Sequence, residues 1–183
     1  MKYTRQKIPE LLIIEPVFHK DLRGYFIETF RQNLLEKAIQ SKISFVQDNE
    51  SMSSKGILRG LHYQIPPFSQ SKLVRVISGS ILDVAVDIRN NSPTFGMHIA
   101  VELNQTNKHQ LFIPKGFAHG FLVLSDFAIV CYKTDNYYSK GSERGIAYND
   151  DKLAIDWGLK LNEILVSDKD KSHPNFSFEK QYF

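Results

Sequence analysis

The sequence predicts an all-β fold of short antiparallel strands. Segments rich in β-branched and aromatic residues recur along the chain. Turn residues separate them at fairly regular intervals, which is typical of sandwiches and barrels. The clearest strand runs from Ile81 to Arg89, where apolar and charged residues alternate and so fall on opposite faces of an extended chain. The apolar face carries Leu82, Val84, Val86 and Ile88, and the other face carries Asp83, Asp87 and Arg89.

The individual elements follow from the same patterns. One segment, Phe30 to Ile39, has apolar residues at helical spacing and predicts a helix. The Ser78-Gly79-Ser80 sequence predicts a turn between two strands. The expected strands are Lys72–Ile77, Ile81–Arg89, His98–Leu103, Leu111–Ile113, Phe121–Leu124 and Ala128–Thr134. These patterns leave the choice of sandwich or barrel open.

Bulk composition limits the classes of function. The 183 residues, 42% of them hydrophobic, suit a single domain over residues 1–183 with a full core. A net charge of +3 with scattered basic residues argues against a nucleic-acid partner. Cys131 is the only cysteine, so neither an intrachain disulfide nor a multi-cysteine zinc site is possible. The N-terminus lacks an apolar secretory stretch and the apolar runs are short, so we expect a cytoplasmic protein without a membrane partner.

Groups able to bind or transfer protons gather in the first half of the chain. Lys72 shares one face of its predicted strand with Val74 and Val76, which directs it toward the interior. A buried lysine is costly unless it meets an anion or a developing negative charge. The alternative is a lysine at a strand end with its amine in water. The polar groups of this region are Gln47, Asn49, Arg59, His62, Gln64 and Lys72.

Tyr132 presents a similar choice. It lies on an apolar strand, with Val130 and Thr134 on its own face. One interpretation is a core tyrosine whose hydroxyl is satisfied internally. The other is a phenol that faces a base across a cavity and exchanges protons with a ligand. Periodicity does not decide between them.

His119 belongs to a turn-and-strand motif. The segment Pro114 to Phe121 has the spacing Pro-x-Gly-x-x-His, which resembles the second sequence motif of cupins. Many cupins bind a metal through this histidine together with a histidine cluster and a glutamate on an earlier strand. Here that earlier region offers His62 alone, whereas a stable first-row metal site needs about three or four protein ligands. We therefore expect no bound metal.

A specific resemblance covers about residues 1 to 172. In order and spacing, the chain is similar to the dTDP-4-dehydrorhamnose 3,5-epimerase family, whose members are dimeric, metal-free cupin jelly rolls. The resemblance implies a cupin-type double-stranded β-helix with a few short helices. The segments that carry it are Asp21–Phe30, Gln47–Ser51, Gly56–Gln64, Lys72–Val76, Asp83–Arg89, Ser92–Gly96, Pro114–Phe121, Tyr132–Lys133, Glu143–Ile146 and Ile155–Trp157.

The resemblance also implies roles for individual residues. His62 matches the base that removes a proton from the sugar, and Asp170 matches the aspartate paired with it, with Asp168 as a near competitor. Tyr132 matches the proton donor, and Lys72 matches the residue beside the ketone oxygen. The implied reaction epimerises C3 and C5 of dTDP-4-dehydro-6-deoxy-D-glucose, without a cofactor, on the route to dTDP-rhamnose and cell-surface polysaccharide.

Contacts to the dTDP-4-keto-sugar substrate are implied as well. Phe26 and Tyr138 are candidates to stack on the thymine ring. The family forms homodimers in which N-terminal strands pair with the partner subunit, so Arg23 and Glu28 are expected to serve the neighbour's site. The expected polar contacts are Arg23, Glu28, Gln47, Asp48, Asn49, Arg59, His119, Glu143 and Lys169.

Two alternatives to the double epimerase stay open. One is an enzyme of the same family that inverts only C3 or C5 of a related dTDP-4-keto-deoxysugar. The other is a non-catalytic cupin that binds a sugar nucleotide. Retention of both proton-transfer groups, His62 and Tyr132, argues against the second alternative, because a binder needs neither.

Overall fold

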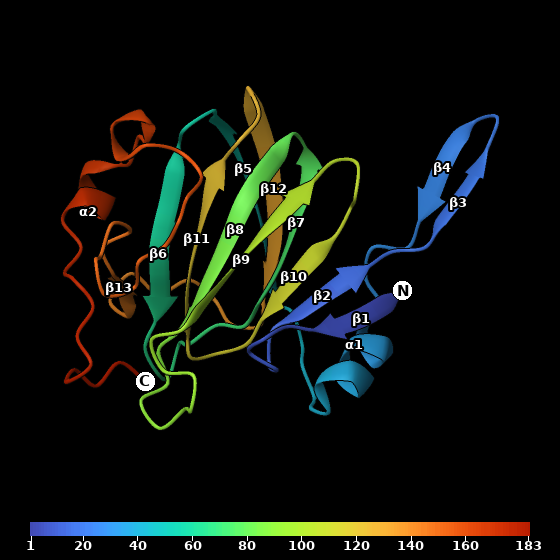
Figure 1. Ribbon diagram of the computed structural model, residues 1–183. Coiled ribbons are helices and arrows are strands. Elements are labelled where there is room, and N and C mark those ends of the chain that lie inside the picture. Colours follow the sequence, from blue (N-terminus) through green and yellow to red (C-terminus); the bar gives the residue numbers. More distant parts are fainter.

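A computed structural model describes residues 1–183 and confirms the all-β prediction. Two antiparallel sheets face each other, and a separate two-stranded hairpin extends from the body (Figure 1). One sheet has the strand order β1(Lys2–Arg5), β2(Leu12–Glu15), β10(Gln110–Ile113), β7(Lys72–Ser78), β12(Phe127–Thr134) and β5(Gln47–Ser54). The other has the order β13(Glu143–Gly145), β6(Leu58–Gln64), β11(Phe117–Val123), β8(Ser80–Asp87) and β9(His98–Asn104).

The predicted elements are present with shifted ends. The helix α1 begins at Gln32 rather than Phe30 and ends at Ile39. Phe30 lies before it and packs edge-on against Phe45, with ring centroids 5.4 Å apart. Strand β11 begins four residues before the predicted Phe121, because all its residues are buried and it shows no alternation. Two short helical segments, Leu161–Glu163 and α2(Asp168–Lys171), were not predicted. No helix of the structure is long and apolar enough to cross a membrane.

Hydrophobic side chains fill two main layers. The first lies between the sheets and includes Val74 of β7 and Phe121 of β11. The second lies on the outer face of the five-stranded sheet, where the C-terminal part of the chain covers it with Trp157 and Phe176. A smaller cluster joins α1 to the six-stranded sheet through Leu35. The five-stranded sheet is therefore buried on both faces.

Strand β8 shows the consequence of this double burial. Its face with Val84 and Val86 packs against the outer, C-terminal layer rather than between the sheets. Its other face places Asp83 and Ala85 toward the space between the sheets, and Asp83 is fully buried. The alternation predicted from sequence is present, but the face with the aspartates is not the solvent face.

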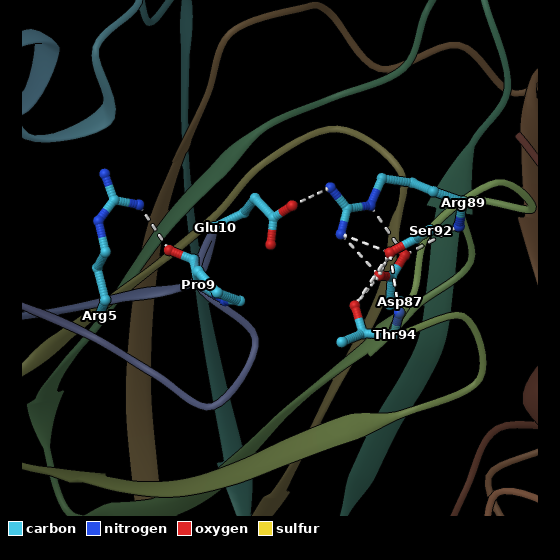
Figure 2. A network of polar contacts seen from close by, with 7 residues as sticks. All are labelled: Arg5, Pro9, Glu10, Asp87, Arg89, Ser92 and Thr94. Carbon is cyan, nitrogen blue, oxygen red and sulfur yellow. Dashed lines mark hydrogen bonds and ion pairs between the residues drawn. The ribbon is translucent and has the colours of Figure 1, made fainter.

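A polar network around Asp87 fixes the chain after β8 (Figure 2). The buried Asp87 carboxylate accepts hydrogen bonds from Arg89 Nε at 2.9 Å and from the hydroxyls of Ser92 and Thr94 at 2.6 Å each. Arg89 also reaches Glu10 Oε1 at 2.7 Å, which links this loop to the segment before β2. A buried carboxylate is tolerated only with such compensation. None of these residues lines the cavity described below, so we infer that the network stabilises the fold and takes no part in the active site.

The hairpin β3(Phe18–Asp21) and β4(Gly24–Ile27) projects away from both sheets (Figure 1). Leu22, at its tip, is fully exposed, and Phe26 is 70% exposed. Exposed apolar side chains on a projecting segment are a typical feature of an interaction surface.

Candidate active site

A cavity of about 900 Å³ opens between the two sheets and is lined by side chains from both. Strands β6 and β11 contribute from the five-stranded sheet, and β5, β7 and β12 contribute from the six-stranded sheet. Helix α2 closes one side. The residues predicted from sequence that line it are Asp48, Asn49, Arg59, His62, Lys72, His119, Tyr132, Lys169 and Asp170.

His62 and Asp170 form a short hydrogen-bonded pair. The Nε2 atom of His62 lies 2.6 Å from Oδ1 of Asp170, while Asp168 is exposed and pairs with Lys171. The Gly60 backbone N–H donates to Oδ2 of Asp170 at 3.3 Å. Burial opposes the charge on Asp170, but the hydrogen bond and charge of His62, the Gly60 N–H and the charge of His173 together outweigh burial and lower the pKa of this carboxyl. An ionised Asp170 takes the Nε2–H of His62 and leaves the Nδ1 lone pair free to act as a base.

Two glycines set the path of β6 next to this pair. Gly60 has a φ of +135°, which favours glycine, and a Cβ there would collide with the Cα of Gly120 on β11. The register between β6 and β11 shifts between His119 and Phe121, beside the same contact. The close approach of the two strands therefore depends on glycine at both positions.

Lys72, His119 and Asp83 form a buried chain of contacts. His119 Nε2 lies 2.7 Å from Asp83 Oδ1, and His119 Nδ1 lies 3.4 Å from Lys72 Nζ. Because an ammonium only donates, Nδ1 of His119 accepts and its Nε2–H donates to Asp83. Burial lowers the pKa of His119, consistent with this neutral form. Burial also lowers the pKa of Lys72 to about 8, against the opposing effect of the Asp83 charge.

Tyr132 approaches the cavity from the sheet opposite His62. It lies on β12, between Asn49 of β5 and Val74 of β7. Its ring packs against the interior cluster, and the same residue lines the cavity, so it combines features of both sequence interpretations. Burial raises the pKa of its phenol. A phenol that stays protonated at neutral pH is available as a proton donor.

A second cluster of polar side chains lies beside the cavity, around Glu143. Its carboxylate accepts a hydrogen bond from the Tyr138 hydroxyl at 2.7 Å and pairs with Lys169 at 2.5 Å. Burial opposes the charge, but the Lys169 and Tyr138 contacts lower the pKa of Glu143. Gln47 donates to Asn49 at 2.8 Å and accepts from the Tyr138 backbone N–H at 3.0 Å. These contacts hold the aromatic ring of Tyr138 in place without burying it.

The other residues expected to contact the substrate either bind protein groups or lie away from the cavity. Arg59 donates from Nε to the Ser53 hydroxyl at 3.0 Å, and its terminal nitrogens make no hydrogen bond within the chain. Asp48 borders the cavity, but its carboxylate is paired with Lys133 at 2.9 Å. The structure does not bring Arg23, Phe26 and Glu28 to this cavity. Arg23 and Phe26 lie on the projecting hairpin, and Glu28 at its base pairs with Arg31.

Two residues near the site were not singled out from sequence. Asp83 lies on the strand face that alternation assigns to solvent, so no local signal in the sequence marks it as buried. His173 lies behind Asp170, with its Nε2 3.3 Å from Asp170 Oδ1. Burial lowers the pKa of His173. Nothing in its local sequence pattern predicts this position.

Comparison with known proteins shows to which family the chain is related. The sequence profile of dTDP-4-dehydrorhamnose 3,5-epimerases matches residues 5–177. The chain belongs to this family. A dTDP-4-dehydrorhamnose 3,5-epimerase from Shigella flexneri is 52% identical to it, and the match covers 96% of each chain.

Solved structures of this family have the same fold. A dTDP-6-deoxy-D-glucose-3,5-epimerase from Legionella pneumophila, in complex with dTDP-4-keto-L-rhamnose, is 48% identical with a TM-score of 0.91 and covers 95% of this chain and 92% of its own. A 3'-monoepimerase from Streptomyces bikiniensis, in complex with dTDP-quinovose, is 34% identical with a TM-score of 0.87 and covers 93% and 86%. The cupin-type jelly roll expected from the 3,5-epimerase resemblance is confirmed.

Proposed function

We propose that this protein converts dTDP-4-dehydro-6-deoxy-D-glucose to dTDP-4-dehydro-L-rhamnose by inverting C3 and C5. The observation that carries the proposal is the approach of His62 and Tyr132 to one cavity from opposite sheets, with Lys72 and His119 in the same lining. The whole chain, residues 1–183, serves as one catalytic domain. The reaction is an isomerisation, because the electrons of each broken C–H bond return to the same carbon and no redox cofactor takes part.

His62 acts as the base in the first step. A proton next to the 4-ketone is acidic because its removal gives an enolate. Nδ1 of His62 takes this proton, and Asp170 stabilises the imidazolium that forms, through the 2.6 Å hydrogen bond to Nε2. Gly60 holds the carboxylate from its other oxygen, so the imidazole keeps one orientation during the transfer.

Lys72 stabilises the enolate. An ammonium beside the ketone oxygen interacts more strongly with the developing oxyanion than with the neutral ketone, and this difference lowers the barrier. Asp83 supports the charged form of Lys72 from within the protein. His119, which is held by Asp83, accepts a hydrogen bond from the Lys72 ammonium and thereby orients the ammonium.

Tyr132 completes the inversion. Its phenol delivers a proton to the face of the enolate opposite the one from which His62 removed it, because the two residues stand on opposite sheets. The tyrosinate regains its proton from solvent, and the imidazolium loses one to solvent. The same pair acts at the second carbon after the sugar shifts in the cavity.

The nucleotide is bound at the mouth of the cavity. Arg59 and Lys169 supply positive charge for the pyrophosphate, and the planar guanidinium of Arg59 can donate paired hydrogen bonds to phosphate oxygens. Tyr138, held by Glu143, presents its ring for stacking on the thymine.

Incubation with dTDP-4-keto-6-deoxyglucose in deuterium oxide tests the proposal. We expect deuterium at both C3 and C5, because each abstracted proton is replaced from solvent. The measurement is NMR of the recovered sugar over time. Unlabelled sugar after long incubation with folded protein would contradict the epimerase function.

The second candidate is inversion of a single carbon. The observation in its favour is the fold shared with the Streptomyces bikiniensis 3'-monoepimerase. The same acid and base serve either reaction, and the loops around the cavity decide how long the first product is held. Deuterium confined to one carbon in the same experiment would establish this candidate and exclude double epimerisation.

The pH dependence tests Lys72. Because its pKa is lowered to about 8, Lys72 is charged below this pH and loses its charge as pH rises through it. Because this pKa is that of the substrate-free protein, we expect kcat/KM to fall on the alkaline side with an apparent pKa of about 8. In Lys72→Arg the guanidinium stays charged, so the lower activity of this variant should keep no such alkaline limb. An identical limb in wild type and Lys72→Arg would show that another group is responsible.

We also propose a homodimer in which the β3–β4 hairpin of one subunit pairs with the partner and completes the partner's site. The support is the hairpin's projection from the body (Figure 1) and its exposed Leu22 and Phe26. Arg23 is also absent from the lining of its own chain's cavity. Arg23 and Glu28 then contact the nucleotide bound by the neighbour. The proposed location is the cytoplasm, where Cys131 stays a free thiol.

Mixing two inactive variants tests the shared site. Arg23→Ala removes a contact made from the hairpin, and His62→Ala removes the base from the cavity. After mixed refolding, heterodimers carry one intact site, so we expect about a quarter of all sites to regain wild-type activity. The measurement is exchange activity of the mixture against each variant alone. Absence of any recovery, with dimers present by sedimentation, would place Arg23 at its own chain's site, and full activity of Arg23→Ala alone would place it at neither site.

A further inference from the structure

Asp170 has a second imidazole neighbour that the proposed reaction does not use. His173 Nε2 lies 3.3 Å from Asp170 Oδ1, the same oxygen that binds His62 Nε2 at 2.6 Å. The His173 side chain is 10% exposed, and its Nε2 is buried without a hydrogen-bond partner. The ligating atoms of the three residues all lie within 4.8 Å of one another. The His62 and His173 rings stand nearly perpendicular, at 86°.

We propose that His62, Asp170 and His173 form an inhibitory binding site for a transition-metal dication of the Zn²⁺ type. Two imidazole nitrogens and one carboxylate oxygen are a ligand set that Zn²⁺ uses with one position left open. The binding rests only on geometry. The inhibition rests in addition on the function proposed above.

The spacing of the ligands suits such an ion. With metal–ligand bonds of about 2.0–2.1 Å, tetrahedral ligand atoms are separated by roughly 3.3–3.4 Å. The distance between His173 Nε2 and Asp170 Oδ1 is already 3.3 Å. His62 Nε2, at 2.6 Å from the same oxygen, would have to withdraw by roughly 0.7 Å to reach this spacing. His62 and Asp170 line the cavity, so the ion and a water for the open position can enter from it.

The surrounding chain holds His173 in place. Its backbone N–H donates to the Asp170 carbonyl at 3.4 Å, and the next carbonyl, of Pro174, accepts from Ala147 at 2.9 Å. The imidazole lies directly over Gly145, where any Cβ would overlap its Nε2. The nearby Lys169 is paired with Glu143, which reduces its repulsion of a cation. The buried, unpartnered nitrogen is thus fixed next to Asp170.

Metal binding would disable the base without any redox step. The ion takes the lone pair of His62 Nε2 after the ring proton moves from Nε2 to Nδ1, and water leaves the ion's hydration shell. Nδ1 then carries a hydrogen and has no lone pair to accept a proton from the sugar. Asp170 gives its Oδ1 to the ion and no longer holds the imidazole by hydrogen bonding. Removal of the ion by a chelator restores the original tautomer.

Titration of the chelator-treated, full-length protein with Co²⁺ in the absence of substrate tests the site. We expect the visible absorption of a low-coordinate Co²⁺ ion, saturating near one ion per chain and displaced by Zn²⁺. His173→Ala removes one ligand and should weaken Co²⁺ binding by roughly 10- to 100-fold or more. The matched control is His109→Ala, which removes a histidine outside the cavity and should bind Co²⁺ as wild type does.

Exchange activity provides the second measurement. Zn²⁺ should inhibit deuterium exchange by wild type, with recovery on addition of chelator, and His173→Ala should keep its activity at the same Zn²⁺ concentration. Mg²⁺ and Ca²⁺ should not inhibit, because they prefer oxygen ligands. Zn²⁺ inhibition that is equal in wild type and His173→Ala would overturn the proposal.

Other outcomes are equally decisive. Absence of the Co²⁺ absorption in wild type overturns the site on its own. If His173→Ala does not fold, Gly145→Ala displaces the imidazole with a Cβ instead and must weaken Co²⁺ binding, and wild-type affinity in that variant contradicts the proposal. Co²⁺ binding by a protein without exchange activity supports the site while refuting the epimerase function.

Discussion

His62→Ala is expected to abolish deuterium exchange into the 4-keto sugar while dTDP binding is largely retained. A positioned general base contributes roughly 10²- to 10⁴-fold to the rate of proton transfer, so we expect a loss in this range or larger. The nucleotide contacts proposed for Arg59 and Lys169 lie elsewhere around the cavity and do not involve the imidazole. Exchange rates by NMR and dTDP affinity by calorimetry measure the two effects separately.

Stability is the main complication of this variant. His62 donates the shortest hydrogen bond to the buried Asp170, and leaving a buried carboxylate without such a donor costs about 1–3 kcal/mol or more. His62→Gln is therefore the matched variant, because its amide N–H can donate toward Asp170 as Nε2–H does, whereas the amide is no base. A folded His62→Gln protein with wild-type exchange would eliminate His62 as the base. If both variants fail to fold, His62 acts as a core residue.

The sequence predicts six of the thirteen strands, most clearly β8, because period-two alternation is a local signal. The faces of β8 could not be assigned, because the layer that covers Val84 is formed by Trp157 and Phe176, far along the chain. Nothing within the strand itself reports this cover. The same cause hid Asp83, since an aspartate on an alternating strand is normally a solvated residue.

The candidate site followed from the family resemblance more than from pattern. Alternation placed Lys72 with Val74 toward the interior, and the structure confirms this placement. It did not reveal that His119 and Asp83 would accompany Lys72, because these contacts join three strands of two sheets. The resemblance preferred Asp170 over Asp168, and the hydrogen bond to His62 agrees with it. The hairpin residues remain a prediction, because a single chain leaves them away from the cavity.

Tyr132→Phe is expected to separate exchange from inversion. The substitution keeps the ring that packs in the interior cluster and removes only the hydroxyl, so folding should be retained. His62, Asp170 and Lys72 still generate the enolate. Loss of the acid on the opposite wall should slow inversion by roughly 10²-fold or more, while exchange with retention of configuration continues through His62. The measurement is the ratio of deuterium incorporation to epimer formation in one NMR time course.

This ratio is informative because the His62 side chain is 28% exposed. An imidazolium in contact with water can trade its abstracted proton for deuterium before it returns that proton to the same face of the sugar. Tyr138→Phe is the control, because its hydroxyl binds Glu143 beside the cavity and should affect substrate affinity without changing the ratio. If Tyr132→Phe lowers exchange and inversion equally, proton removal itself needs the phenol. Separate proton removal by His62 and proton donation by Tyr132 would then be contradicted, and a single concerted step would replace them.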